Sequence, residues 1–273
     1  KETWKDILFY STNSRLIDIF AEELAYNMQM NDIYTMEAKW SLAKQISSIM
    51  AEVKFFNYKP FRKTGSYGKL RVSASSTFSA SYPRSVEFSK FSTFSTNAGL
   101  NVCASETTSM AAGVNYIDID VVQGTPKEIV FIAKGDENET FTVLNQNIEN
   151  NVFEVVVNNE VWNLVDFIRE GQGPEDKVYT LSNALDFSGV TIGFGDGYFS
   201  KKLSASDVIT FRFVETEGSK GNIQSTGTVV NVVSTIFDSA GDEVQIYCTN
   251  TSGITGGKDY EDIESIRTRA PKT

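Results

Sequence analysis

The sequence predicts an α+β protein in which an N-terminal helical segment is followed by two mainly antiparallel β domains. Neither Pro nor Gly interrupts residues 1–59, and apolar residues recur there at helical spacing. From Gly68 onward, short runs alternate apolar with polar residues and are separated by turn-forming Gly, Asn and Asp. With 273 residues, 41% of them hydrophobic, the chain is long enough to bury more than one core.

The helical segment is expected to span residues 1–56. It begins with a short apolar patch around Trp4, after which Ser11 or Ser14 can cap the next helix by accepting bonds from its free amides. In that helix, apolar residues recur every four positions and form a stripe along one face, with acidic and amide side chains on the other side. Apolar residues between 42 and 53 predict a further helical stripe.

Two interpretations of the first stripe stay open. The helices can form a hairpin that packs on its own chain, or part of the stripe can dock on another subunit, because so long a stripe has limited local core to cover. The candidate subunit-interface residues are Leu16, Phe20, Leu24, Met28, Met36 and Trp40.

The first β group begins near residue 57 and reaches a turn at Gly124-Thr125-Pro126. Leu70 and Val72 alternate with basic residues, and apolar residues between 116 and 122 alternate with Asp118 and Asp120. A second β group follows, in which Asn158-Asn159 is expected to form a hairpin turn. Trp162 is expected to pack in the core of this group rather than to bind a ligand.

Two more strands are expected at residues 190–194 and 209–213, joined as a hairpin by a long loop that contains Gly195-Asp196-Gly197. The last two strands are expected at residues 228–237 and 244–248, with a turn at 238–242. In the tail, Asp259 is expected to cap a short helix that ends near Arg267 and Arg269.

Composition excludes several classes of function. The 25 basic and 35 acidic residues give a net charge of −10, which disfavours binding to nucleic acid or to an anionic membrane. The chain has no histidine, so Ser-His-Asp and Cys-His catalysis and histidine metal sites are excluded. Sequence alone leaves a disulfide between Cys103 and Cys248 open, but two buried reduced thiols are the preferred expectation. No apolar run is long enough to span a bilayer, and no signal peptide is visible.

Clustered carboxylates do not make a convincing catalytic or metal site. Asp118 and Asp120 are expected on a solvated strand face, and the acidic residues between 136 and 139 in a turn. A glycan-cleaving enzyme would need two carboxylates facing each other across a cleft, which the sequence does not identify. The loop after Asp196 lacks the oxygen ligands of an EF-hand. We therefore expect no catalytic residues, cofactor or metal, and not an enzyme.

Three segments, taken in order, resemble the baseplate J-like family, the baseplate wedge proteins of contractile-tailed, T4-like bacteriophages. The first runs from Glu37 to Val72 and contains Tyr58-Lys59-Pro60, which leads from a helix into a strand. The second runs from residue 189 to 222, and the third is the tail from residue 256 to 271. The family-like positions are Phe194, Gly195, Asp196, Gly197, Gly218, Gly221, Asn222, Gly256, Gly257, Asp259 and Arg267.

The resemblance implies a structural subunit of a phage tail baseplate wedge, located in the virion and assembled in the host cytoplasm. Such a subunit would bind other copies of itself and other wedge proteins in a ring that rearranges on tail contraction, without nucleic acid and without membrane insertion. With the family as guide, residues 57–123 and 223–254 form one β domain and residues 124–222 are inserted into it. Residues 255–273 would then open a further module of a longer protein.

The alternative is a carbohydrate- or receptor-binding β module of a tail fibre or tailspike. It would explain the Ser-, Thr- and Asn-rich strands but leaves the helical segment unused. An exposed cluster of aromatic rings in a groove would favour it, and burial of all three tryptophans would count against it.

Overall fold

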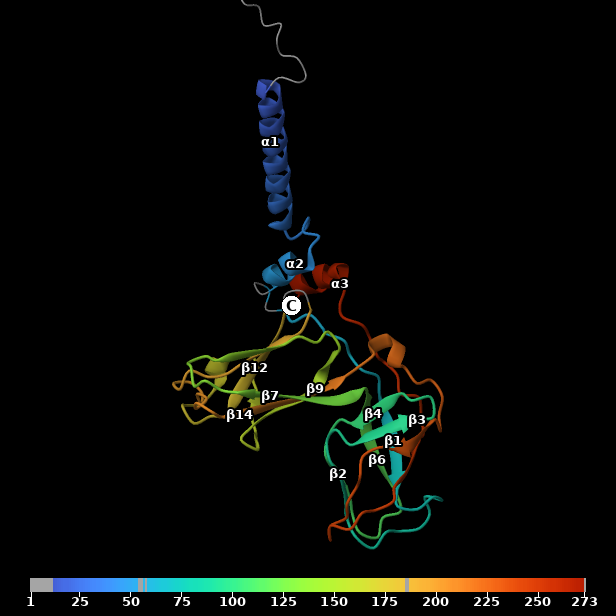
Figure 1. The fold of residues 1–273 in the computed structure, drawn as a ribbon. Coiled ribbons are helices and arrows are strands. Elements are labelled where there is room, and N and C mark those ends of the chain that lie inside the picture. The colour runs from blue at the N-terminus through green and yellow to red at the C-terminus, as the bar shows by residue number, and fades with distance from the viewer. Residues whose placement is uncertain (1–11, 54–55, 57, 185–186, 273) are drawn as a thin grey trace, which may run out of the picture. The chain divides into compact units, whose positions relative to one another are not determined.

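A computed structural model describes residues 12–53, 56, 58–184 and 187–272 (Figure 1). The chain forms two compact units, one comprising residues 1–59 with 262–273 and the other residues 60–261. The first unit contains α-helices and the second is built of β-strands, as the sequence predicts. The expected apolar patch around Trp4 and the Ser11 cap lie outside the described residues.

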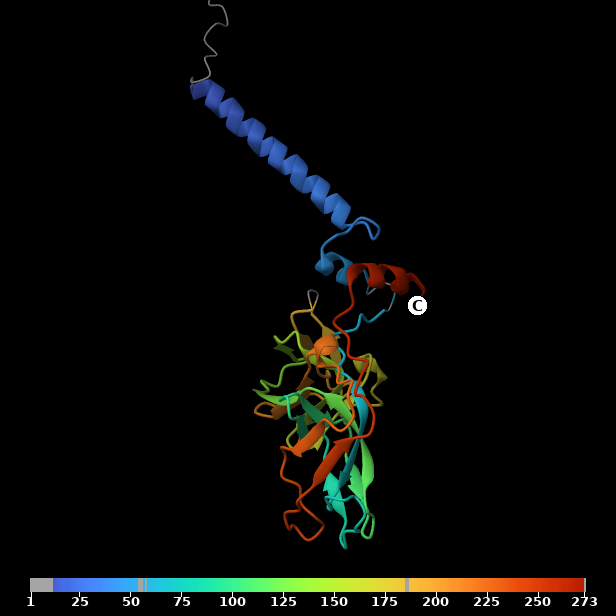
Figure 2. The same cartoon turned by 90° about the vertical axis from the view of Figure 1, so that its right-hand side faces the viewer.

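The helical unit contains α1 (Thr12–Glu37), α2 (Ile46–Val53) and α3 (Ile263–Arg269), followed by the 3₁₀ turn η4 (Ala270–Lys272) (Figure 2). Helix α2 packs against α3, and Ile49, Met50 and Ile266 are buried. The Glu37 carboxylate accepts 3.0 Å bonds from the backbone N–H groups of Lys44 and Gln45 and so anchors the turn before α2. These two bonds lower the pKa of Glu37.

Two expectations about the helical regions are wrong. Trp40 does not extend the stripe of α1, because α1 ends at Glu37 and Trp40 lies in the following turn, where its ring packs 5.1 Å from that of Phe56. The cap of α3 is Asp262 rather than Asp259, since Asp262 Oδ1 accepts a 2.7 Å bond from the Ser265 amide.

Six antiparallel strands of the β unit form a nearly closed barrel. Their order is β15 (Val229–Val232), β3 (Thr93–Thr96), β4 (Asn101–Ala104), β6 (Ile117–Gln123), β1 (Tyr67–Ser73) and β16 (Tyr247–Asn250). The two outermost strands approach each other at the buried Asn250, whose Oδ1 accepts bonds of 2.8 and 3.0 Å from the amides of Thr228 and Val229. One side chain thus replaces part of the missing ladder between β15 and β16.

The remaining strands form two four-stranded sheets and one small pair. One sheet has the order β10 (Glu160–Val161), β9 (Ile148–Val157), β14 (Val208–Glu215) and β7 (Thr125–Ile132). The other has the order β11 (Asn163–Leu164), β12 (Val178–Asn183), β13 (Val190–Gly193) and β8 (Thr140–Val143). Strands β2 (Val86–Phe88) and β5 (Thr108–Met110) pair separately. Only β11 and β12 pair in parallel among the described strands, so the mainly antiparallel prediction is confirmed.

The two four-stranded sheets share one hydrophobic core. Phe141 on β8 lies 5.0 Å from the ring of Phe131 on β7, and Trp162 meets Phe194 edge-on at 5.6 Å. Trp162 is 4% exposed, which confirms its expected place in the core. The prediction of a hairpin between residues 190 and 213 is wrong, because β13 and β14 belong to different sheets. Alternation of residues predicts that a strand has a buried face but not which strand it pairs with.

Of the predicted turns, those at Asn158-Asn159 and at residues 238–242 are confirmed, whereas Thr125 and Pro126, expected in a turn, belong to β7. Asn158 and Asn159 both have positive φ in the tight turn between β9 and β10. The strand expected over residues 228–237 is shorter, ending at Val232, and Phe237 makes only an isolated bridge to Glu243 around the predicted 238–242 turn. The barrel is formed by strands from residues 67–123 together with strands from residues 229–250, while the two four-stranded sheets come from residues 125–215. The proposed domain division itself stays a prediction.

Candidate functional site

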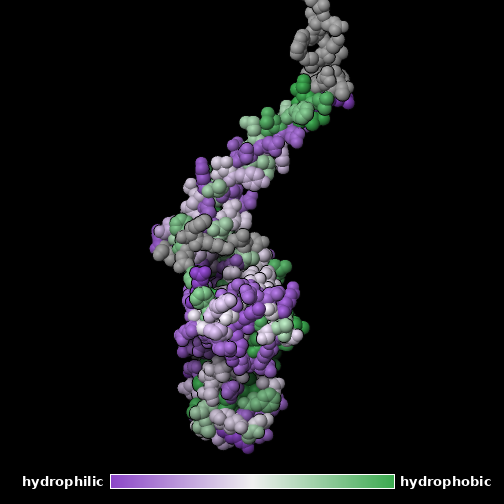
Figure 3. All heavy atoms as spheres, turned by 90° about the vertical axis from the view of Figure 1, so that its left-hand side faces the viewer, coloured by the Kyte–Doolittle hydropathy of each residue, from purple (hydrophilic) through white to green (hydrophobic). Residues whose placement is uncertain are grey.

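Helix α1 carries a large set of exposed apolar side chains. Phe20 is 67% exposed, and none of the described side chains from Arg15 to Glu37 is buried. Figure 3 shows hydrophobic side chains gathered on α1 toward its N-terminal end. The exposed apolar side chains of α1 are Leu16, Ile17, Ile19, Phe20, Leu24, Tyr26, Met28, Tyr34 and Met36. The described helices therefore do not bury the stripe in a helical hairpin.

These side chains are not confined to one narrow face. At about 100° per residue, Leu16, Phe20, Leu24 and Met28 follow a row that turns slowly around the helix. Met36 is 16 residues after Phe20, which places it about 160° away around the axis. Apolar residues on several faces are typical of a helix that is surrounded by partners in its assembled state.

Four family-like positions of the second and third segments, Gly218, Asn222, Gly257 and Asp259, meet at one junction in the β unit. Asn222 Oδ1 accepts a 3.0 Å bond from the amide of Gly257, and Asn222 Nδ2 donates to the Ser219 carbonyl at 2.8 Å. Ser219 in turn donates a 2.6 Å bond to Asp259 Oδ2, which lowers the pKa of Asp259. The junction joins the 3₁₀ turn η3 (Gly218–Gly221) to the segment that leads out of the barrel.

Two of these positions require glycine. Gly218 has a φ of +64°, and a Cβ there would lie 2.5 Å from Asp259 Oδ1. A Cβ on Gly257 would overlap the carbonyl oxygen of Gly218. Gly221 packs against Gln123, and Gly256 has a positive φ at the exposed start of the segment. The junction is a close approach of two backbones, so these glycines have a structural role.

Phe194, Gly195, Asp196 and Gly197 form a separate turn after β13. Phe194 is buried in the core between the two four-stranded sheets. Asp196 Oδ1 accepts bonds of 2.8 and 3.1 Å from the amides of Tyr198 and Phe199, and these bonds lower its pKa. Arg267, the last family-like position, lies on α3 in the helical unit and donates a 2.9 Å bond to Glu264.

Three of the clustered carboxylates, Asp118, Asp120 and Glu139, have structural partners. Asp118 is bonded to Arg71 at 2.8 Å and Asp120 lies 3.7 Å from Lys69, both across the β1–β6 pair. Glu139 accepts bonds from the amides of Lys134 and Gly135. Among the residues that the structure describes, no group of three or more His, Cys, Asp or Glu could hold a metal ion. Both cysteines are buried and free, as predicted.

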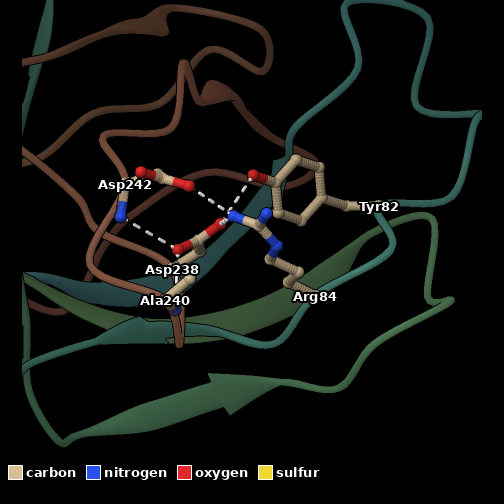
Figure 4. Close-up of polar contacts among 5 residues, drawn as sticks. All are labelled: Tyr82, Arg84, Asp238, Ala240 and Asp242. Atoms are coloured by element: carbon tan, nitrogen blue, oxygen red, sulfur yellow. Dashed lines mark hydrogen bonds and ion pairs between the residues drawn. The ribbon is translucent and has the colours of Figure 1, made fainter.

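Figure 4 shows a polar cluster that was not predicted from the sequence. The Asp238 carboxylate accepts bonds from Tyr82 at 3.0 Å, from Arg84 at 2.9 Å and from the backbone amides of Ala240 and Asp242. Burial alone would raise the pKa of Asp238, but these donors together lower it to about 2. The sequence signal, an acidic turn at residues 238–242, did not reveal the long-range partners Tyr82 and Arg84.

The two tryptophans in the described part of the chain give little support to the sugar-binding alternative, and Trp4 lies outside the described residues. Trp162 is buried, and Trp40 is partly buried against Phe56. The feature in its favour is the pair Tyr198 and Phe199, whose side chains are exposed next to the Asp196 turn.

The chain matches no protein-family model and none of the curated proteins. No helix in the described part of the chain is both long enough and apolar enough to cross a membrane.

Proposed function

We propose that this chain is a structural subunit of a contractile-tail baseplate wedge and that α1 is the element that binds a neighbouring subunit. The observation that carries the proposal is the exposure of nine apolar side chains of α1 between Leu16 and Met36. Burying one Leu, Met or Phe side chain contributes about 1.5–3 kcal/mol. Four such side chains are therefore of the same order as the roughly 4–15 kcal/mol that association costs.

The charge of α1 indicates the chemistry of its partner. Between Thr12 and Glu37 the only basic residue is Arg15, whereas five residues are acidic, which gives a net charge of 1 − 5 = −4. The acidic residues are Asp18, Glu22, Glu23, Asp32 and Glu37. A partner groove lined by apolar side chains and edged by Lys or Arg would complement this helix.

The test is the substitution Phe20→Asp in the whole chain. We expect it to abolish incorporation into wedges reconstituted with the other tail proteins, because a charge would be buried in the contact. The β unit should keep its near-UV circular dichroism and its thermal transition.

The matched control is Gln29→Asp, which adds the same charge at an exposed polar position about 180° around the helix from Phe20. It should assemble more readily than Phe20→Asp. If Phe20→Asp instead aggregates and unfolds, the stripe belongs to an internal core; if it assembles normally, α1 is not the contact.

A further inference from the structure

Strand β7 leaves one edge of its sheet unpaired by any strand in the described part of the chain. The Ala133 amide, just after β7, points toward β14 and donates to the Asp207 carbonyl. Val208 on β14, which lies opposite Ile132, points the other way, because its carbonyl accepts from the Asn158 amide on the β9 side. Backbone groups point alternately to the two sides of a strand. The amide and carbonyl groups of Val130 and Ile132 therefore point away from β14, toward the free edge.

The side chains of the same residues form an apolar surface on the outer face. Val130 is 55% and Ile132 is 69% exposed, and the register places Ile132 beside Val208 on β14. The opposite face of β7 packs Phe131 into the core. A long edge strand with an exposed apolar face is a template for adding another strand, and proteins usually protect such edges with charges or Pro. In β7, Pro126 lies at the start, away from Val130 and Ile132.

The sequence around this edge is complementary to itself. When two copies pair antiparallel about a two-fold axis at Phe131, Val130 faces Ile132 of the second copy. The same register sets Glu128 opposite Lys134 of the second copy, and both are exposed. The axis repeats each contact, so two apolar and two oppositely charged pairs form together. Both Glu128 and Lys134 follow the alternation that places Val130 and Ile132 on the outer face.

We propose that β7 is an interface between two copies of this chain, which joins their four-stranded sheets into one continuous sheet. This surface is separate from α1, so the proposal does not depend on the function proposed above. It adds a two-fold contact to any contact that the helix makes.

The test measures self-association of the whole chain by sedimentation equilibrium, in a Phe20→Asp background that removes association through α1. We expect a reversible dimer. Glu128→Lys alone and Lys134→Glu alone each place like charges opposite one another twice, and each should raise the dimer Kd about tenfold or more. The double variant Glu128→Lys/Lys134→Glu should restore the dimer.

Glu128 also forms an exposed ion pair with Arg212 of its own chain at 3.4 Å. Both the single variant Glu128→Lys and the double variant lose this pair, so restored dimerisation of the double variant shows that its loss is not what weakens the dimer. Glu243→Lys, at an exposed site in another turn, should leave the Kd unchanged. A chain that stays monomeric at every concentration would overturn the proposal. So would a dimer that is insensitive to the single reversals, or one that the double reversal does not restore.

Discussion

Asp238 shows how a single carboxylate can hold two distant loops of the barrel together (Figure 4). Its side chain is buried and joins the 238–242 turn to Tyr82 and Arg84, more than 150 residues earlier in the chain. Its pKa is about 2 in the folded protein, below its ordinary value of 3.8. The carboxylate therefore stabilises the fold above pH 3.8, and this contribution is lost as the pH falls toward 2.

We predict that Asp238→Asn lowers the Tm by several degrees at pH 7, because Asn keeps the shape but not the charge that Arg84 binds. The Tm difference from the unmodified chain should shrink as the pH is lowered from 4 to 2, as measured by scanning calorimetry. Asp242→Asn is the control, since Asp242 contacts the same Arg84 but is largely exposed and should have a smaller effect. A Tm difference that is constant with pH would show that the charge of Asp238 has no such role.

At the level of the element, barrel closure depends on Asn250. Besides accepting from Thr228 and Val229, its Nδ2 donates to the Ser225 and Ser252 carbonyls at 2.8 and 2.9 Å. In Asn250→Leu, the Leu side chain has a shape similar to that of Asn but leaves these backbone groups without their hydrogen-bond partner. We predict a loss of about 3 kcal/mol or more in the free energy of unfolding, since each unsatisfied buried group costs about 1–3 kcal/mol.

Urea unfolding checks this prediction, with Asn231→Leu as the matched control. Asn231 lies on the neighbouring strand β15 but is exposed, so its substitution should change stability by less than about 0.5 kcal/mol. Equal effects of the two substitutions would mean that Asn250 does not close the barrel.

Local patterns predicted individual elements better than their partners. The turn at Asn158-Asn159 and the burial of Trp162 follow from residue type and spacing, and both are confirmed. The hairpin expected between residues 190 and 213 is wrong because strand pairing depends on the core that both sheets share. The four-residue spacing of apolar side chains predicted a helix that reached Trp40. The helix ends earlier, because the Glu37 carboxylate accepts bonds from the amides of Lys44 and Gln45 and holds residues 38–45 in a turn.

At the level of the whole molecule, the sequence predicted the order of helices and strands but not the contacts that connect distant segments. The family-like positions were found as motifs, and the structure places four of them, including Asn222 and Gly257, at one junction. The Asp238 cluster and the free edge of β7 were not predicted, because each is defined by register or by partners far away in the chain. The candidate interface on α1 was predicted as a stripe, whereas its exposure required the structure.

The central claim, that α1 binds a neighbouring tail subunit, is tested most directly by zero-length crosslinking of purified contractile tails. Carbodiimide joins carboxylates to amines in direct contact, and α1 offers Glu22, Glu23 and Asp32 but no lysine. We predict crosslinks from these carboxylates to lysines of another tail protein, identified by mass spectrometry, or to a second copy, identified in a crosslinked species of twice the chain mass. Absence of the chain from the tails, or crosslinks of α1 only to lysines of its own chain, would contradict the account.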